Sequence, residues 1–169
     1  NVAGMQPIAT IRPPISNDYA QAPGVADLRS VDISPDGRLV AAAGQVRADG
    51  TSRVFVFDVA SGEMIASPLS GRGYVADIAF SADGGLLAAG VASMDDTKNG
   101  LWVWDTQNWQ VIYRDAAYDG REERFRRING IKFNRAGVLV TTSWDGKLRR
   151  YANVRAENPG LTSVQVPQG

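Results

Sequence analysis

The chain has 169 residues, long enough for one domain with a real core, and its 18 basic residues balance 18 acidic ones. It contains no cysteine, which excludes disulfides and thiolate sites, and no histidine, which removes the commonest general base and the commonest zinc ligand. No apolar run approaches the roughly 18 residues of a membrane span, and no signal peptide is visible.

Charge is unevenly divided along the chain. Residues 1–113 carry 7 basic and 12 acidic side chains, whereas residues 114–169 carry 11 basic and 6 acidic ones. This division favours head-to-tail association, or an acidic partner for the basic end. Chance composition is the alternative interpretation.

One string of residues occurs three times. ISPDGRLVAAAG at 33–44 returns as FSADGGLLAAGV at 80–91 and as FNRAGVLVTTSW at 133–144. The dipeptides Asp36-Gly37 and Asp83-Gly84 predict hairpin turns, because glycine readily adopts positive φ. The small apolar residues after each turn predict a strand that is buried on both faces.

A second string follows the first in each copy. RVFVFD at 53–58 returns as GLWVWD at 100–105 and as KLRRYA at 147–152, so that Phe57, Trp104 and Tyr151 are each 47 residues apart. These segments predict a further strand in every copy. The aspartates Asp58 and Asp105 are expected to be structural and to accept hydrogen bonds from the backbone of the next turn.

A further strand is expected before each pair of strings, at residues 7–12, 64–67 and 110–114. The chain then divides into three units, 1–58, 59–105 and 106–152, and a polar tail, 153–169. The tail holds one weak strand candidate at 161–166.

The two recurring strings resemble the WD40 repeat, and the resemblance covers roughly residues 5–152. It implies an all-β fold of three four-stranded antiparallel β-propeller blades, which cannot close a ring alone because propellers need four to eight blades. The sequence departs from the family because many WD40 units use a Gly-His pair before the first strand. We therefore expect the positions near residues 73–74 and 127–128 to be held by packing alone. The residues that carry the repeat signature are Asp36, Gly37, Phe57, Asp58, Asp83, Gly84, Trp104, Asp105, Trp144, Asp145 and Tyr151.

Three interpretations account for the missing blades. The chain is a segment of a longer propeller, or two copies join head to tail, or another subunit supplies the rest. In the two-copy ring, residues 8–11 would complete the partner's blade that ends at Tyr151. Arg150 occupies the position of Val56 and Val103, so we expect it to face a partner, water or a carboxylate. An irregular terminal repeat with an exposed face is the alternative.

Three lengthened connections indicate where a partner binds. They span 45–52, 91–99 and 115–127, and the resemblance implies that they emerge on one face of the propeller. The last one mixes arginines with aromatic residues, as interface hot spots do. It also contains four acidic residues, so self-paired surface charge is the alternative and a nucleic-acid partner is not expected. The candidate partner-binding residues are Arg47, Asp49, Asp95, Asp96, Tyr118, Arg121, Arg124, Phe125, Arg126 and Arg127.

We therefore expect a non-catalytic scaffold or sensor module that binds a protein or peptide, without a cofactor, metal or membrane partner, in the cytoplasm. Residues 95–100 resemble the opening of a calcium loop, but the twelfth position is Thr106 rather than glutamate. The competing hypotheses are a propeller hydrolase using Asp49, Asp95, Asp96 and Glu122, and a regulatory segment of an effector enzyme such as a protease or kinase.

Overall fold

The computed structural model describes residues 10, 26–46, 51–93, 99–116, 118 and 127–167, and every regular element in these ranges is a strand. The strands are β1 (Ala26–Ile33), β2 (Leu39–Val46), β3 (Thr51–Asp58), β4 (Met64–Phe80), β5 (Leu86–Ser93), β6 (Gly100–Asp105), β7 (Val111–Asp115), β8 (Ile128–Phe133), β9 (Leu139–Ser143), β10 (Lys147–Tyr151) and β11 (Leu161–Gln165). The described residues include no helix that could span a membrane. The predicted strand at 7–12 lies outside them apart from Thr10, which belongs to no strand.

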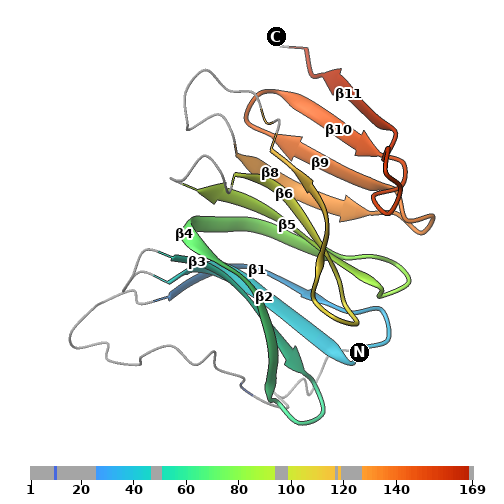
Figure 1. Cartoon of the computed structure of the whole chain (residues 1–169). Helices are drawn as coiled ribbons and strands as arrows, with labels where there is room; N and C mark the ends of the chain where they lie inside the picture. Colours follow the sequence, from blue (N-terminus) through green and yellow to red (C-terminus); the bar gives the residue numbers. More distant parts are fainter. Residues whose placement is uncertain are drawn as a thin grey trace, which may run out of the picture.

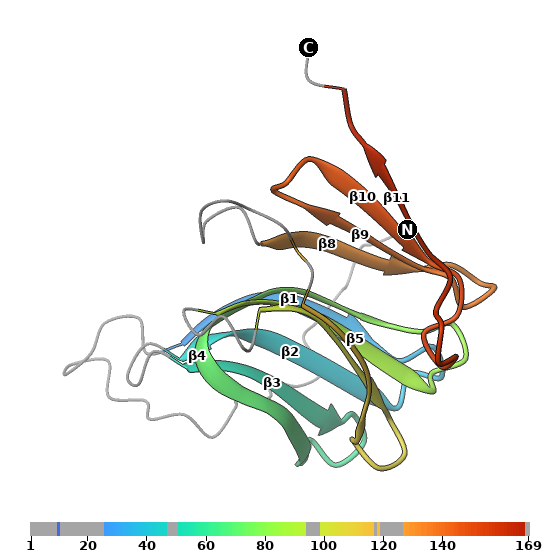
Figure 2. The same cartoon turned by 45° about the horizontal axis from the view of Figure 1, so that its top comes forward.

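The strands form three four-stranded antiparallel blades that stack face to face (Figures 1 and 2). Blade 1 contains β1, β2, β3 and residues 64–72 of β4, while blade 2 contains residues 73–80 of β4 with β5, β6 and β7. Blade 3 contains β8 to β11. The long strand β4 therefore serves two blades, as the outer strand of the first and the inner strand of the second. The predicted fold class is confirmed.

The tail strand β11 is the outer strand of blade 3. It pairs with β10 from Lys147–Gln165 to Tyr151–Leu161. The weak strand candidate at 161–166 is thus confirmed. The idea that residues 8–11 of a second copy complete this blade is wrong, because β11 already occupies the edge of β10.

The core lies between the blades. One buried cluster joins blade 1 to blade 2 and includes Val54, Ile78 and the fully buried Trp104. A second cluster joins blade 2 to blade 3 and includes Leu101 and Tyr151. The small residues of β2 and β5 let the sheets approach closely, which is why both faces of these strands are buried as predicted.

The first two turns between inner strands share one hydrogen-bonding pattern. Ser34 Oγ donates to Asp36 Oδ1 at 2.6 Å and accepts the amide of Leu39, and the equivalent serine and aspartate in blade 2 repeat both bonds. Gly37 adopts a φ of 73°. The Ser34 hydrogen bond, helped by the Arg38 amide, lowers the pKa of the Asp36 carboxyl. The aspartates and glycines of these turns are structural, as expected.

The corresponding turn of blade 3 is one residue shorter than the sequence repeat suggests. The amide of Asn134 bonds to the carbonyl of Val138, whereas Ser34 bonds to Leu39 five residues on. Asn134 Oδ1 accepts the amides of both Ala136 and Val138 and so closes a tighter turn. Aligning FNRAGVLVTTSW residue by residue with the other copies is therefore wrong from Val138 onward, and a one-residue slip moves each side chain to the opposite face.

The aspartates at the ends of β3 and β6 hold the turns that follow them, whereas Trp144 and Arg150 of blade 3 are exposed. Asp58 Oδ1 accepts the amide of Ser61 at 2.8 Å, and Asp105 Oδ1 accepts that of Gln107 in the same way, as predicted. Trp144 is not a core residue: it lies in the β9–β10 turn and is 51% exposed. Arg150 is exposed on the outward face of blade 3, which agrees both with its expected contact with water and with the alternative of an irregular terminal repeat.

Candidate protein-interaction surfaces

The long connections all join strand ends on the same side of the blades. Antiparallel pairing places the end of β2 beside the start of β3, the end of β5 beside the start of β6, and the start of β8 beside the end of β9. The turns at 34–38, 81–85 and 134–138 lie on the opposite side (Figure 1). We call these the loop-bearing side and the turn side.

A row of stacked cations and rings crosses the loop-bearing side. The guanidinium carbons of Arg29 and Arg127 lie 4.8 Å and 5.1 Å from the Tyr74 ring centre, and that of Arg127 lies 5.8 Å from the Trp144 ring centre. Each distance suits a cation–π interaction. These four residues, which we call the stacked row, come from all three blades or the segments joining them.

The stacked row corrects the expectation that residues near 73–74 and 127–128 are held by packing alone. Tyr74 and Arg127 stabilise these positions by cation–π contact. The backbone adds a further bond, because the amide of Trp144 donates to the carbonyl of Arg127 at 3.0 Å.

Only two of the ten candidate partner-binding residues lie in the described part of the chain. Arg127 is half-buried and belongs to the stacked row. Tyr118 is 1% exposed, so its assignment to a partner-binding surface is wrong. The others, Arg47, Asp49, Asp95, Asp96, Arg121, Arg124, Phe125 and Arg126, lie outside the described residues.

Tyr118 is buried because its hydroxyl joins a polar cluster between blades 2 and 3. It lies 2.8 Å from the Tyr151 hydroxyl and 3.1 Å from Thr141 Oγ1, and Tyr151 donates to Asp115 Oδ2 at 2.7 Å. Burial raises the pKa of Tyr118 to about 12 and moves that of Tyr151 further upward. Both phenols therefore stay neutral, and their hydrogen bonds join Asp115 and Tyr118, at the end of β7 and just after it, to strands of blade 3.

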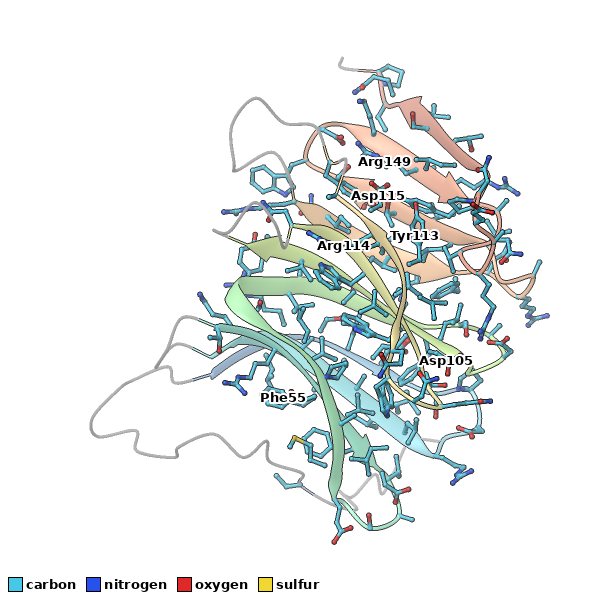
Figure 3. All side chains as sticks on the ribbon, viewed as in Figure 1. Phe55, Asp105, Tyr113, Arg114, Asp115 and Arg149 are labelled. Atoms are coloured by element: carbon cyan, nitrogen blue, oxygen red, sulfur yellow. The ribbon has the colours of Figure 1, made fainter. Side chains whose placement is uncertain are left out.

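A buried ion pair supports this cluster from β10. Arg149 Nη2 lies 2.6 Å from Asp145 Oδ2, its Nη1 donates to Ser143 Oγ at 2.8 Å, and its guanidinium carbon lies 4.3 Å from the Tyr118 ring centre. Figure 3 labels Arg149 together with Asp115 near blade 3. Burial opposes ionisation of Asp145, but the bonds from Arg149 and Ser143 outweigh it and lower the pKa of this carboxyl. Sequence reasoning missed Arg149, although a cation at the position of Phe55 and Trp102 was a visible signal.

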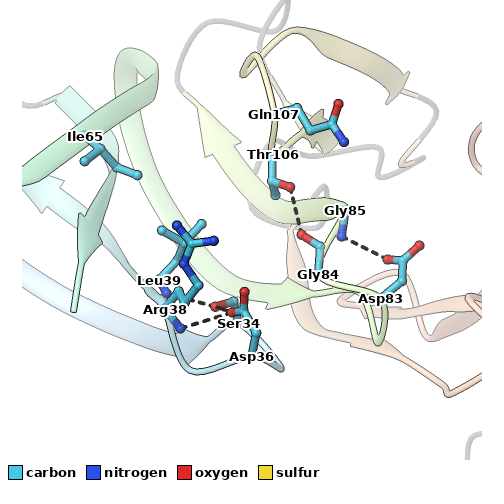
Figure 4. A pocket seen from close by; sticks show the side chains of 10 residues that line it. All are labelled: Ser34, Asp36, Arg38, Leu39, Ile65, Asp83, Gly84, Gly85, Thr106 and Gln107. Carbon is cyan, nitrogen blue, oxygen red and sulfur yellow. Dashed lines mark hydrogen bonds between the residues drawn. The ribbon is translucent and has the colours of Figure 1, made fainter. Parts of the chain in front are cut away.

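The turn side carries an open depression of about 430 Å³ between blades 1 and 2 (Figure 4). Its carboxylates, Asp36 and Asp83, accept bonds from their own serine hydroxyls and from backbone amides. Hydrogen bonding lowers the pKa of each, which is the opposite of what a general acid requires. Between blades 2 and 3, the side chain of Arg155 crosses the corresponding depression, and its Nη1 lies 3.2 Å from Asp105 Oδ2.

The described residues hold no group of three or more carboxylates placed to bind a metal ion. The calcium-like segment and the proposed hydrolase carboxylates fall largely in 47–50, 94–98 and 119–126, outside these residues.

Comparison with known proteins agrees with this geometry. The family model for the WD domain, G-beta repeat, matches residues 22–55 and 62–97. A guanine nucleotide-binding protein subunit beta from Arabidopsis thaliana is 33% identical over 131 residues, which cover 75% of this chain and 32% of that protein. The chain belongs to the WD40-repeat β-propeller family.

Solved structures show the same fold at lower identity. A chain of the mitotic checkpoint complex aligns with 99% of this chain and 48% of its own, at 22% identity and a TM-score of 0.64. The RRP9 WD40 repeats align with 83% of this chain and 39% of theirs, at 22% identity and a TM-score of 0.63. The Dos1 propeller aligns with 82% and 32%, at 17% identity and a TM-score of 0.62. The chain thus spans 32% to 48% of the length of these proteins.

Proposed function

We propose that the chain is a non-catalytic scaffold that binds a protein or peptide on its loop-bearing side, as part of a larger propeller. WD40 repeat domains typically act as protein-interaction scaffolds. The observation that carries the proposal is the stacked row, in which Trp144 stays 51% exposed beside the cation of Arg127. Tryptophan and arginine are the side chains most enriched in interface hot spots.

The geometry of the row suits recognition because its side chains are already ordered. Arg127 is held between Tyr74 and Trp144, so a partner binding there would lose little side-chain entropy. The backbone of Arg127 is also fixed, because its carbonyl accepts the amide of Trp144 at 3.0 Å. A partner would therefore meet a row whose backbone and side chains are both held in place.

The described residues favour binding over catalysis. The carboxylates of the turn side are engaged with their own turns, so they are not free to act as acid and base. A regulatory role inside an effector enzyme and a cytoplasmic location stay predictions.

Partner capture tests the proposal. Trp144→Ala and Arg127→Ala should each reduce recovery of partner proteins on the immobilised chain, by about tenfold or more for the tryptophan, because a hot-spot side chain contributes about 2 kcal/mol or more. Ile65→Ala is the control, since Ile65 is 48% exposed and lines the depression on the turn side. If Ile65→Ala abolished capture of the same partners and Trp144→Ala did not, the partners would bind on the turn side, which would contradict the proposal.

A further inference from the structure

The depression between blades 1 and 2 has a counterpart that the chain fills with one of its own side chains. Between blades 2 and 3, Arg155 reaches from the β10–β11 connection to blade 2. Its Nη1 lies 3.2 Å from Asp105 Oδ2, and its Nη2 donates to the carbonyl of Gly85 at 3.2 Å. One planar guanidinium thus binds a carboxylate and a backbone carbonyl at the same time. We call the first depression open and the second filled.

The same two acceptors recur beside the open depression. Asp58 and Arg38 stand 47 residues before Asp105 and Gly85. Each aspartate uses its Oδ1 to hold the turn that follows it. The carbonyls of Arg38 and Gly85 each accept the amide of the residue after the aspartate, at 2.8 Å and 3.1 Å. A carbonyl oxygen has a second lone pair, which Gly85 offers to Arg155, so the Arg38 carbonyl has the same capacity.

The connection of blade 2 that corresponds to the one bearing Arg155 carries no cation. Asn108 stands 47 residues before Arg155, and its Oδ1 accepts the amide of Gln110 within its own turn at 2.8 Å. This connection is also shorter, because residues 106–110 join β6 to β7 whereas residues 152–160 join β10 to β11. The open depression therefore measures about 430 Å³, compared with about 280 Å³ for the filled one (Figure 4).

The open depression is one positive charge short of the filled one. Its charged lining residues and the adjacent aspartate are Asp36, Asp58, Asp83 and Arg38, which give a net charge of −2. The filled depression, counted in the same way, has two carboxylates and Arg155, which give −1. Hydrogen bonds lower the pKa of all three carboxyl groups of the open depression, so these groups stay ionised at neutral pH. The missing charge favours a cationic ligand.

Arg38 weakens the fit of such a ligand without preventing it. Gly85 makes room for Arg155, since a Cβ at position 85 would lie 2.8 Å from Nη2. Because Arg38 has a Cβ at the equivalent position, an entering guanidinium would lie slightly further out, which the end of a flexible side chain can do. The exposed Arg38 side chain also repels a second cation.

We propose that the open depression binds an arginine side chain of a protein partner, held between the Asp58 carboxylate and the Arg38 carbonyl. Arginine suits this pair of acceptors better than lysine, because its terminal nitrogens lie in one plane and bind two acceptors at once. The site lies on the turn side, so the inference goes beyond the proposed function and is independent of the stacked row.

A peptide with the sequence of residues 152–156, Ala-Asn-Val-Arg-Ala, is the probe, acetylated and amidated at its ends. Added to the full natural polypeptide, it should shift the NMR signals of the Arg38 and Val59 amides until the site is saturated. The same peptide with citrulline in place of arginine has a similar shape without the charge, and it should bind about tenfold more weakly. Equal affinity of the two peptides would overturn the proposal.

Matched substitutions locate the binding. Asp58→Asn keeps the Oδ1 acceptor for Ser61 but removes the charge, and it should weaken the peptide about tenfold. Asp105→Asn makes the same change at the filled depression and should leave the affinity measured at the Arg38 amide unchanged. Arg38→Gly removes both the Cβ and the competing charge, so it should tighten binding about fivefold. Equal effects of the two aspartate substitutions would contradict the proposal.

Removing Arg155 supplies the positive control. Arg155→Ala empties the filled depression, so the peptide should then also shift the amides of Leu86 and Gly137, which line it. If the peptide binds there and leaves the Arg38 amide unchanged, the open depression is not an arginine site. Binding at neither place would also overturn the proposal, because the shared acceptors would not hold an arginine from another chain. Trp144→Ala should leave the binding unchanged, which separates this inference from the proposed function.

Discussion

Replacing Arg149 by methionine tests whether the buried ion pair holds blade 3 together. The substitution keeps most of the side-chain volume but removes the bonds to Asp145 at 2.6 Å and to Ser143 at 2.8 Å. The side chains of Arg149 and Asp145 are only 4% and 5% exposed, so the carboxylate would stay buried without its cation. Removing one partner of such a pair costs about 3–5 kcal/mol, which lowers the midpoint of thermal unfolding by on the order of 10 °C.

Urea unfolding followed by tryptophan fluorescence measures this cost. Adding Asp145→Asn to Arg149→Met should recover part of the loss, because the orphaned charge is removed. The free energy of unfolding of the double variant should therefore lie above the value expected if the two losses added. A cost below about 1 kcal/mol for Arg149→Met, or strict additivity, would refute the assigned role.

Three further predictions concern the backbone, the tyrosines and the contacts between blades. Gly100→Ala should destabilise the chain by several-fold more than Gly37→Ala in urea unfolding, because at φ 108° its new Cβ would collide with a backbone carbonyl, whereas Gly37 has open space around it. Burial raises the pKa of Tyr118 from 10.0 to about 12, so the stability that this phenol contributes is complete below the pKa of the unfolded state and declines as the pH rises toward 12. Tyr118→Phe should therefore flatten the dependence of stability on pH in this range, and an unchanged dependence would contradict the prediction. Asp77→Ala should accelerate hydrogen exchange of the Ile131 amide by about tenfold, as expected from the loss of about 1.4 kcal/mol, and unaltered exchange would show that the bond between the blades is unimportant.

Much of the fold was predictable because local chemistry repeats in the sequence. The dipeptides Asp36-Gly37 and Asp83-Gly84 mark turns that glycine alone accommodates without strain. The small apolar runs after them match strands buried on both faces. The beginning of β4 at Met64 and the tail strand β11 also lie where the strand patterns predicted them.

The remaining features depend on contacts that a sequence pattern does not contain. The register of blade 3 changes because Asn134 closes its turn one residue earlier, although the aligned letters have equal length. The burial of Tyr118 depends on Tyr151 and Thr141, which are distant along the chain. The stacked row likewise joins residues from separate repeats.

Hydrogen exchange of the chain with and without a captured partner tests the central claim most directly. If the chain is a scaffold that binds through its loop-bearing side, a partner should slow exchange at Tyr74, Arg127 and the 144–146 turn. The turns at 34–38 and 81–85 should exchange at unchanged rates. Protection of those turns instead, with none at the stacked row, would contradict the account.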